Sequence, residues 1–511
     1  MQSTKKTVYF SDPLASYISS CSFNTAPFRE YDARLYDLVQ GERNTRDSGL
    51  CMTSNVSQTF LSVDQCDRRL FAAENNEEKF YARSHYIDEI ERLAELRTLN
   101  AYGLDANKWR CSIRSVDDES HHSVAVRLQL LKSGDRTMSF NLPKDSVCGD
   151  NTTTLFYDSL PSSASTVNSV VDYNYIDRTA RIYRPKVLII GATSFGRNNS
   201  YETFAEIARR VDANLMVDIT NVAPLLTARV LPSPFDDRLN VAAVVQTMYS
   251  DICGKQCLVV LYRRDLSDRP MPTTMRLNEK HTHAVALVAS QMRQVHEQVE
   301  HYRQAVLNAQ SLSTALQQRN LRVVTGTTDT HTLTVDLVPM HLYAQTTTRL
   351  LSFFGISCTP TALPNDRYSN NLQHHRGLRF GLLGLTLRGL CDHDEIQVLA
   401  DLIERAIVLM SKLTSYCCDR QLRLNATISA LLNGEWRAIE STELMDDLHQ
   451  LRSEVRDYAF ALDTWNEEDD DATMSSAMSS ELSSEEEEES NGEEEEKNDS
   501  NDTIPSTCSI V

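Results

Sequence analysis

The chain has 511 residues, of which 41% are hydrophobic and 24% charged, which is enough for one large core or for two to three domains. It contains no run of about 18 apolar residues, and residues 1–20 lack the apolar stretch of a signal peptide, so we predict neither a membrane span nor secretion. The twelve cysteines have no paired spacing, which predicts reduced thiols in the cytoplasm or nucleus and argues against a structural metal site.

The negative charge lies almost entirely near the C-terminal end. The formal net charge is −20, and residues 466–511 contribute −16 of it through 17 acidic residues and one lysine. The other 465 residues therefore carry only −4 and show no basic bias, so we expect no nucleic-acid partner.

Residues 1–31 are polar and irregular, and we expect a disordered N-terminal arm. Apolar residues then recur at helical spacing in two stretches, 33–46 and 86–100. In the second stretch the residues that recur at helical spacing are Ile87, Ile90, Leu93, Leu96 and Leu99.

The middle of the chain alternates short apolar runs with amphipathic stretches. We predict strands at 187–190, 215–217 and 258–262, and a helix at 201–211 that buries Phe204, Ile207 and Ala208. Strand, helix and strand at these lengths are typical of a parallel sheet with crossover helices. Residues 32–319 are therefore predicted to form an N-terminal segment and a large α/β domain.

The following residues favour a second, smaller unit. A long helix is predicted at 284–319, then strands at 321–324 and 333–337 and a helix at 395–413. These elements predict a small α+β domain over residues 320–462.

Residues 463–511 form an acidic Ser/Glu-rich tail with almost nothing apolar to bury, and we expect it to be disordered. It is either a solubilising tail or an interaction segment for basic proteins, which takes phosphate on the serines among its acids, Ser480, Ser483, Ser484 and Ser490. Cys508–Val511 has the form of a prenylation motif, or of a free-carboxylate ligand for a peptide-binding domain.

Five segments resemble serine hydroxymethyltransferases in the same order along the chain. They are Tyr183–Ser194, Leu215–Asp218, Val230–Phe235, Val259–Arg263 and Gly377–Gly381, and looser similarity extends the likeness from about residue 32 to residue 462. The resemblance implies an α/β protein of the pyridoxal-phosphate-dependent transferase fold (fold type I, aspartate aminotransferase-like). Such a protein has a mostly parallel seven-stranded sheet and assembles as a dimer.

Pyridoxal phosphate requires a Schiff-base lysine, a carboxylate at its pyridine nitrogen and donors for its phosphate. The resemblance assigns the carboxylate to Asp218, a serine near the ring to Ser194, and the clamp for the substrate carboxylate to Arg379. The structural alternatives are that Asp218 only caps a strand end and that Arg379 is a buried ion-pair partner.

Ser250 stands where the family carries its cofactor lysine, and Tyr249 replaces the preceding histidine, when the chain is counted back from Tyr262 without a gap. A serine hydroxyl cannot form a Schiff base with an aldehyde. Acids at the phosphate position would repel a phosphate dianion. The resemblance places these acids at Asp117–Glu119, or one residue later. It places Val147 at the stacking histidine, Asn221 at the histidine three residues past the aspartate, Thr361 at the folate-side asparagine, and Asn278 and Glu279 at the paired glycines that meet the phosphate across the dimer.

We therefore interpret the chain as a serine hydroxymethyltransferase-like protein without catalytic residues, expected to bind no cofactor and to act as a scaffold or regulatory partner in one-carbon metabolism. Expected partners are a second copy, an active relative and proteins bound by the acidic tail. The alternative is a divergent pyridoxal-phosphate-dependent glycine hydroxymethyltransferase that interconverts serine and glycine with tetrahydrofolate and uses Lys255 as its anchor. A third interpretation is a small-carboxylate sensor built around Arg379.

Overall fold

A computed structural model provides the fold of the chain. It describes residues 49–52, 85–115, 124–125, 128–132, 134–140, 158–162, 171–191, 196–249, 256–267, 282–295, 299–363, 374–434, 439 and 443–462. The predicted arm at 1–31, the predicted helix at 33–46 and the acidic tail at 463–511 lie outside these residues.

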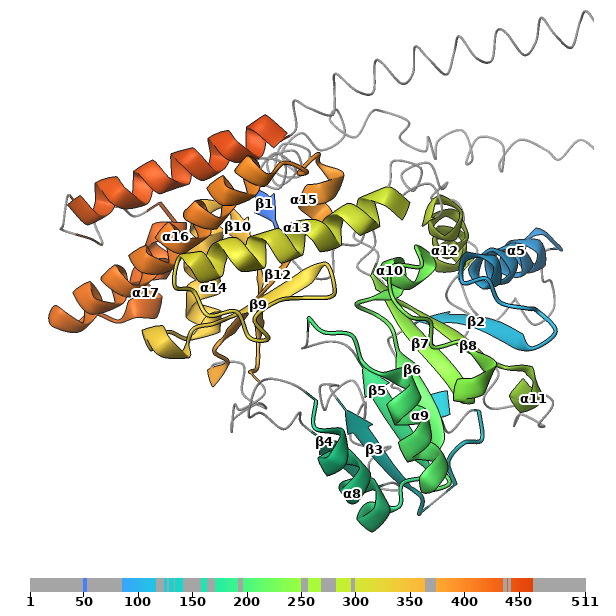
Figure 1. Cartoon of the computed structure of the whole chain (residues 1–511). Coiled ribbons are helices and arrows are strands. Elements are labelled where there is room, and N and C mark those ends of the chain that lie inside the picture. Colours follow the sequence, from blue (N-terminus) through green and yellow to red (C-terminus); the bar gives the residue numbers. More distant parts are fainter. Residues whose placement is uncertain are drawn as a thin grey trace, which may run out of the picture.

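One half of the protein is built on a seven-stranded sheet (Figure 1). Its strand order is β2-β8-β7-β6-β5-β3-β4. Neighbouring strands run parallel from β4 to β7, and β8 is antiparallel to both β7 and β2. The prediction of a mostly parallel seven-stranded sheet is therefore confirmed. The strands are β2 (Trp109–Ser115), β3 (Arg136–Phe140), β4 (Asp158–Ser162), β5 (Val187–Gly191), β6 (Asn214–Asp218), β7 (Val241–Tyr249) and β8 (Gln256–Arg263).

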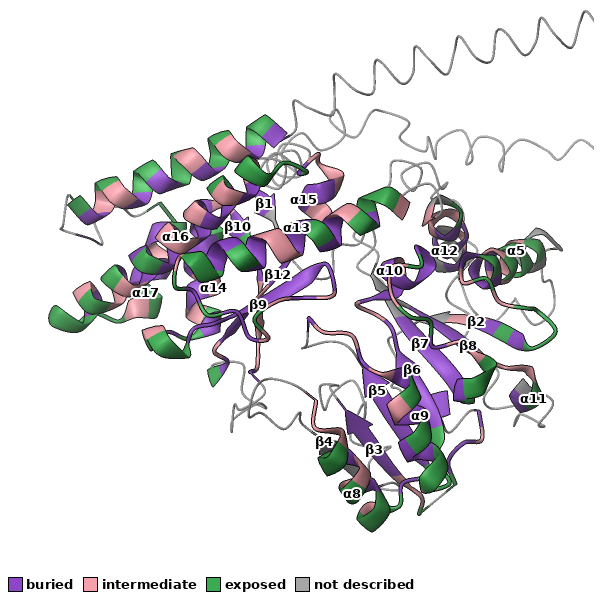
Figure 2. Ribbon diagram, viewed as in Figure 1, coloured by how far each residue is buried: buried purple, intermediate pink, exposed green. Residues whose placement is uncertain are grey.

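Both faces of this sheet are covered, which explains why its central strands are continuous apolar runs. In β5, Leu188 and Ile190 belong to one buried cluster, while Val187 and Ile189 belong to another on the opposite face. Figure 2 shows the central strands as buried along most of their length. The predicted strands at 187–190, 215–217 and 258–262 are confirmed within β5, β6 and β8.

Helix α9 (Tyr201–Arg210) follows β5 and confirms the predicted crossover helix with its buried Phe204, Ile207 and Ala208. It begins at the N-cap Ser200, whose hydroxyl accepts the Thr203 backbone N–H at 3.3 Å. The other helices of this half are α5 (His85–Ala101), α8 (Tyr173–Tyr183), α10 (Ala223–Thr227), α11 (Arg264–Ser267) and α12 (Thr282–Gln294).

The helix predicted at 86–100 is confirmed by α5, but not all of its apolar residues at helical spacing are buried. Leu93 and Leu96 are 41% and 50% exposed, whereas Leu99 is buried. The inner face of α5 instead contains Ala94, which packs against Val285 and Ala289 of α12. A small side chain at this point lets the two helices approach closely, and the leucines one residue before and two residues after it then point outward.

The other half contains the antiparallel three-stranded sheet β11-β12-β9 and a layer of helices (Figure 1). Its strands are β9 (Thr332–Asp336), β11 (Thr359–Thr361) and β12 (Gly377–Gly381). Its helices are α13 (Val299–Gln318), α14 (Ala344–Phe354), α15 (Leu383–Leu387), α16 (His393–Asp419), α17 (Leu424–Leu432) and a helix over 443–462. The predicted strand at 333–337 and helix at 395–413 are confirmed by β9 and α16.

Two predictions in this region are wrong. The single helix expected at 284–319 is two helices, α12 and α13. Helix α12 packs on the seven-stranded sheet, whereas the buried residues of α13 belong to two other hydrophobic clusters. Residues 321–324 do not form a strand, because their backbone pairs with β9 at a single isolated bridge, Val323–Val335.

A short N-terminal segment completes the core of the second half. Strand β1 (Leu50–Cys51) pairs in parallel with β10 (Ile356–Ser357). Leu50 and Met52 are fully buried in one cluster with residues drawn from 309 to 462. Arg388 also connects this N-terminal segment to the helix over 443–462, because its guanidinium donates to the carbonyls of Gly49 at 2.7 Å and Ala459 at 2.9 Å.

We expect Asn308→Ala to destabilise the protein by about 1–3 kcal/mol, because buried polar partners would lose their hydrogen bonds. The Asn308 amide is 1% exposed and donates to Thr386 Oγ1 at 2.9 Å and to the Leu390 carbonyl at 2.6 Å. Urea denaturation would measure the change. Gln304→Ala is the control, because Gln304 is partly buried and its side chain donates to Asn308 Oδ1 at 2.9 Å. An equal loss in both variants would contradict this account.

Candidate functional site

The carboxyl ends of β5 and β6 lie side by side, since Gly191 pairs with Asp218 in the parallel register. Asp218 is 5% exposed, and its Oδ1 accepts the backbone N–H of Thr220 at 2.7 Å. Burial, and after it the Asp218 charge, raises the pKa of the Tyr201 phenol. Open α/β sheets bind ligands at this edge, so the position of Asp218 fits a role in binding.

Asn199 also belongs to this edge, although the sequence analysis did not single it out. Its amide nitrogen donates to the carbonyl of Gly191, the last residue of β5, at 3.1 Å. The side chain is 5% exposed, and within the described part of the chain its Oδ1 accepts no hydrogen bond. No sequence signal distinguishes this asparagine from an ordinary residue before a helix N-cap.

The described lysines lie away from this edge. Lys108, Lys132 and Lys186 each precede a strand at the amino edge of the sheet, and the first and last of them pair with Asp237 and Asp212. These lysines therefore lie at the opposite ends of the strands from Asp218, which is the last residue of β6. Lys412 lies on α16, in the other half, and pairs with Asp447 at 3.1 Å.

Two predicted site residues, Ser194 and Ser250, lie outside the described residues. Strand β7 nevertheless ends at Tyr249, so Ser250 is the next residue along the chain from that strand end. Two lysines outside the described residues are close in sequence to strands of this sheet. Lys144 comes four residues after the end of β3, and Lys255 comes directly before β8. Of the groups that pyridoxal phosphate requires, the carboxylate therefore fits, and the described residues offer no amine for a covalent anchor.

Arg379 lies on β12, in the other sheet. It pairs in register with Thr334 of β9 and Thr359 of β11, and cross-strand partners share a face of the sheet. These three polar side chains therefore form one row, while the adjacent Leu378 and Phe380 are fully buried on the opposite face. An arginine between two threonine hydroxyls is suited to bind a carboxylate.

The most specific part of the resemblance, Val230–Phe235, has a packing role. The Phe235 ring lies 5.3 Å from the Tyr102 ring and 5.2 Å from the Trp109 ring, measured between centroids. The Tyr102 hydroxyl donates to Gln246 Oε1 of β7 at 2.5 Å, and burial raises the pKa of this phenol. This run thus fixes β7, the strand that leads to Ser250.

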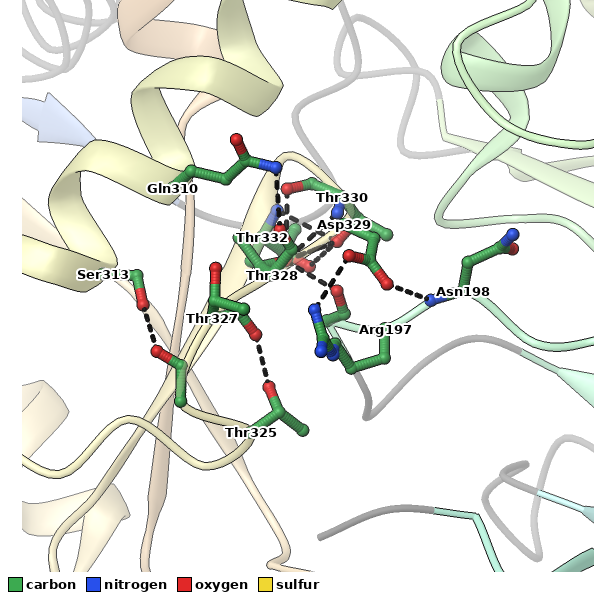
Figure 3. Close-up of polar contacts among 12 residues, drawn as sticks. Arg197, Asn198, Gln310, Ser313, Thr325, Thr327, Thr328, Asp329, Thr330 and Thr332 are labelled. Carbon is green, nitrogen blue, oxygen red and sulfur yellow. Dashed lines mark hydrogen bonds and ion pairs between the residues drawn. The ribbon is translucent and has the colours of Figure 1, made fainter.

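A joint connects the two sheets (Figure 3). We define it as residues 196–198, which follow β5, and residues 328–332, which lead into β9. The Asp329 carboxylate accepts a hydrogen bond from the Arg197 guanidinium at 2.9 Å and from the Asn198 backbone N–H at 3.1 Å. The Asp329 backbone N–H donates to the Gly196 carbonyl at 2.6 Å. No local sequence pattern marks this joint, because its two segments are about 130 positions apart.

Of the remaining family positions, two are described. Asn221 lies in the turn after β6, three residues past Asp218, and Thr361 lies on β11 opposite Gly377 of β12. The described residues hold no group of three or more histidine, cysteine or carboxylate side chains that could share a metal ion. No helix in the described ranges has both the length and the apolar character needed to cross a membrane.

Comparison with known proteins gives one family. A family model for serine hydroxymethyltransferase matches residues 28–403. The chain is 27% identical over 461 residues to a serine hydroxymethyltransferase of Bombyx mori, covering 84% of this chain and 95% of that protein. It is 28% identical over 417 residues to the cytosolic enzyme of Oryctolagus cuniculus, and 24% identical over 423 residues to the mitochondrial enzyme of Schizosaccharomyces pombe; these matches cover 75% and 76% of this chain and 84% of each enzyme.

Proposed function

Because the chain belongs to the serine hydroxymethyltransferase family, we propose that it is a catalytically inactive member that acts as a scaffold or regulatory partner in one-carbon metabolism. The family uses pyridoxal phosphate to interconvert serine and glycine. The observation that supports inactivity is Ser250 at the family's lysine position, directly after the end of β7. A hydroxyl cannot replace the amine that anchors the cofactor aldehyde.

The described residues support the same proposal. Asp218 keeps the carboxylate at the sheet edge, but Lys108, Lys132 and Lys186 lie at the opposite edge. Among the described residues, no lysine lies at the edge where Asp218 could face the cofactor.

We expect the purified protein, mixed with pyridoxal phosphate, to show no absorbance band of a protein Schiff base. The measurement is a spectrum before and after borohydride, with a family enzyme that retains its lysine as the positive control. A band that borohydride removes, together with a pyridoxyl group mapped to one specific lysine, would overturn the proposal.

The alternative is a divergent glycine hydroxymethyltransferase that takes its amine from another residue. Lys255 is the first candidate, because it lies five residues past Ser250, and Lys144 is the second, because it follows the end of β3. Peptide mapping after reduction separates the two lysines. If Lys255→Arg removes the adduct and the serine–glycine exchange together while Lys144→Arg preserves both, Lys255 is the anchor.

We further propose that the protein forms a homodimer, or a heteromer with an active relative, in the cytoplasm or nucleus, and that the acidic tail binds basic proteins. The family is typically oligomeric. The exposed Leu93 and Leu96 on α5 offer apolar surface for such a contact. Relatives include cytosolic and mitochondrial forms. Native mass spectrometry of the chain alone and mixed with an active relative distinguishes the two assemblies, and a monomer in both samples contradicts them.

A second candidate function is the binding of small carboxylates, supported by the row of Thr334, Arg379 and Thr359. Isothermal titration with glycine is expected to give heat in the wild type and none in Arg379→Gln. Arg376→Gln is the matched control, because Arg376 lies three residues earlier and stacks on the Tyr343 ring at 5.1 Å. Absence of heat in the wild type would exclude this function.

A further inference from the structure

The joint leaves no free space for a side chain at Gly196. A Cβ built at this residue would lie 2.6 Å from Thr328 Oγ1 and 2.9 Å from the Thr332 carbonyl oxygen. The Thr328 hydroxyl lies 2.7 Å from the Gly196 carbonyl and 2.6 Å from the Thr332 carbonyl, and it donates to one of them at a time. The two segments therefore meet through their backbones, which leaves little freedom for one to slide on the other.

Each side of the joint continues directly into one part of the candidate site. On one side, Asn199 follows the joint and holds the carbonyl of Gly191, whose register partner is Asp218. On the other side, Thr332 begins β9, and two residues later Thr334 pairs with Arg379. The joint is thus one described contact between the strand end carrying Asp218 and the sheet carrying Arg379. A second is apolar, where Leu225 of α10 packs in one cluster with Tyr302 of α13 and Leu383.

The Arg197–Asp329 ion pair adds little stability, but it orients the two segments of the joint relative to each other. The Arg197 and Asp329 side chains are 42% and 40% exposed, so water screens their attraction. One carboxylate nevertheless bridges the Arg197 guanidinium and the Asn198 backbone N–H, which fixes both the angle and the distance between the two segments (Figure 3).

We propose that Arg197 and Asp329 are positioning residues, which set the separation and angle between the sheet edge carrying Asp218 and the sheet carrying Arg379. A ligand that contacts both sheets depends on that separation, so the ion pair acts on binding through Asp218 and Arg379 without touching the ligand. The binding part of the proposal rests on carboxylate binding at Arg379, and the geometric part does not.

Spin labels carried by unnatural side chains test the geometry without ligand. One label replaces the exposed Asn174 of α8 and the other the exposed Ser415 of α16, which places one on each side of the joint. In Arg197→Gln and in Asp329→Asn we expect the distance distribution to widen about twofold or to shift, whereas Arg197→Lys stays near the wild type because lysine can still pair with Asp329.

Asp177→Asn is the matched control. It removes an aspartate that pairs with Arg181 at 2.9 Å and with Arg210 at 3.2 Å, both within the seven-stranded half and away from the joint. Its distribution should equal that of the wild type. If the Arg197→Gln and Asp329→Asn distributions also superimpose on the wild type, with thermal midpoints showing that all variants fold, the positioning proposal is wrong.

Glycine titration then tests the consequence for binding. Arg197→Gln is expected to weaken glycine binding about tenfold, with Arg197→Lys close to the wild type. Equal affinities in all three proteins would overturn the binding part. If the wild type itself gives no heat, the carboxylate function fails, and the label distances alone decide the geometric part.

Discussion

Replacing Phe204 with alanine is expected to lower the free energy of unfolding by about 3–5 kcal/mol, the largest loss we predict for a single substitution. Phe204 is fully buried on the inner side of α9. Its ring lies 5.3 Å from the Phe140 ring of β3 and 5.4 Å from the Tyr173 ring of α8, measured between centroids. Removing it leaves a cavity between the sheet and two helices, which the rigid sheet cannot close.

Urea denaturation gives the measurement, and Phe460→Ala provides a control of the same chemistry. The Phe460 side chain is 68% exposed on the helix over 443–462, so its loss should change the unfolding free energy by no more than about 0.5 kcal/mol. A cost for Phe204→Ala below about 1 kcal/mol would show that α9 does not pack on the sheet as described.

Gly196→Ala is expected to destabilise the protein by about 1–3 kcal/mol, although alanine is normally tolerated before a helix. The added Cβ would meet Thr328 Oγ1 at 2.6 Å and the Thr332 carbonyl at 2.9 Å, and a backbone atom cannot move aside cheaply. Either the joint opens or β9 shifts, so hydrogen exchange at the Asp329 amide, which donates to Gly196, should accelerate.

The neighbouring Asn198→Ala separates this clash from a general effect of altering the loop. Asn198 contributes to the joint through its backbone N–H, which alanine retains. The unfolding free energy of the Asn198→Ala variant should remain within about 0.5 kcal/mol of the wild-type value. If Gly196→Ala is equally mild and the Asp329 amide stays protected, the two segments do not meet as tightly as described.

Much of the large sheet could be predicted from the sequence, because its strands are short apolar runs and α9 has a clear helical stripe. The predictions failed where tertiary packing decides the outcome. Leu93 and Leu96 have the spacing of a buried face, yet Ala94 is the residue that contacts α12. Leu321 and Val323 look like a strand and are buried, but as a loop against the core.

Some residues of the candidate site could likewise be predicted from the sequence, and others could not. Asp218 and Arg379 could be found from sequence, since each lies in a short motif on one strand. Asn199 and the joint of Arg197 with Asp329 could not, because no local pattern marks residues that meet only after the two sheets come together. Ser250 is visible only as a departure from a family pattern, and composition alone would not reveal it.

The burial of Leu50 and Met52 among residues 309–462 affects how the polypeptide can fold as it leaves the ribosome. The strand made first has its partner, β10, some 300 positions later, and Arg388 also binds the carbonyls of Gly49 and Ala459. Completion of this core must therefore wait until nearly all of the chain has been synthesised. A fragment starting at α13, near residue 299, would keep the other members of this core and lack Leu50 and Met52, so adding residues 40–60 as a separate peptide should rescue its solubility.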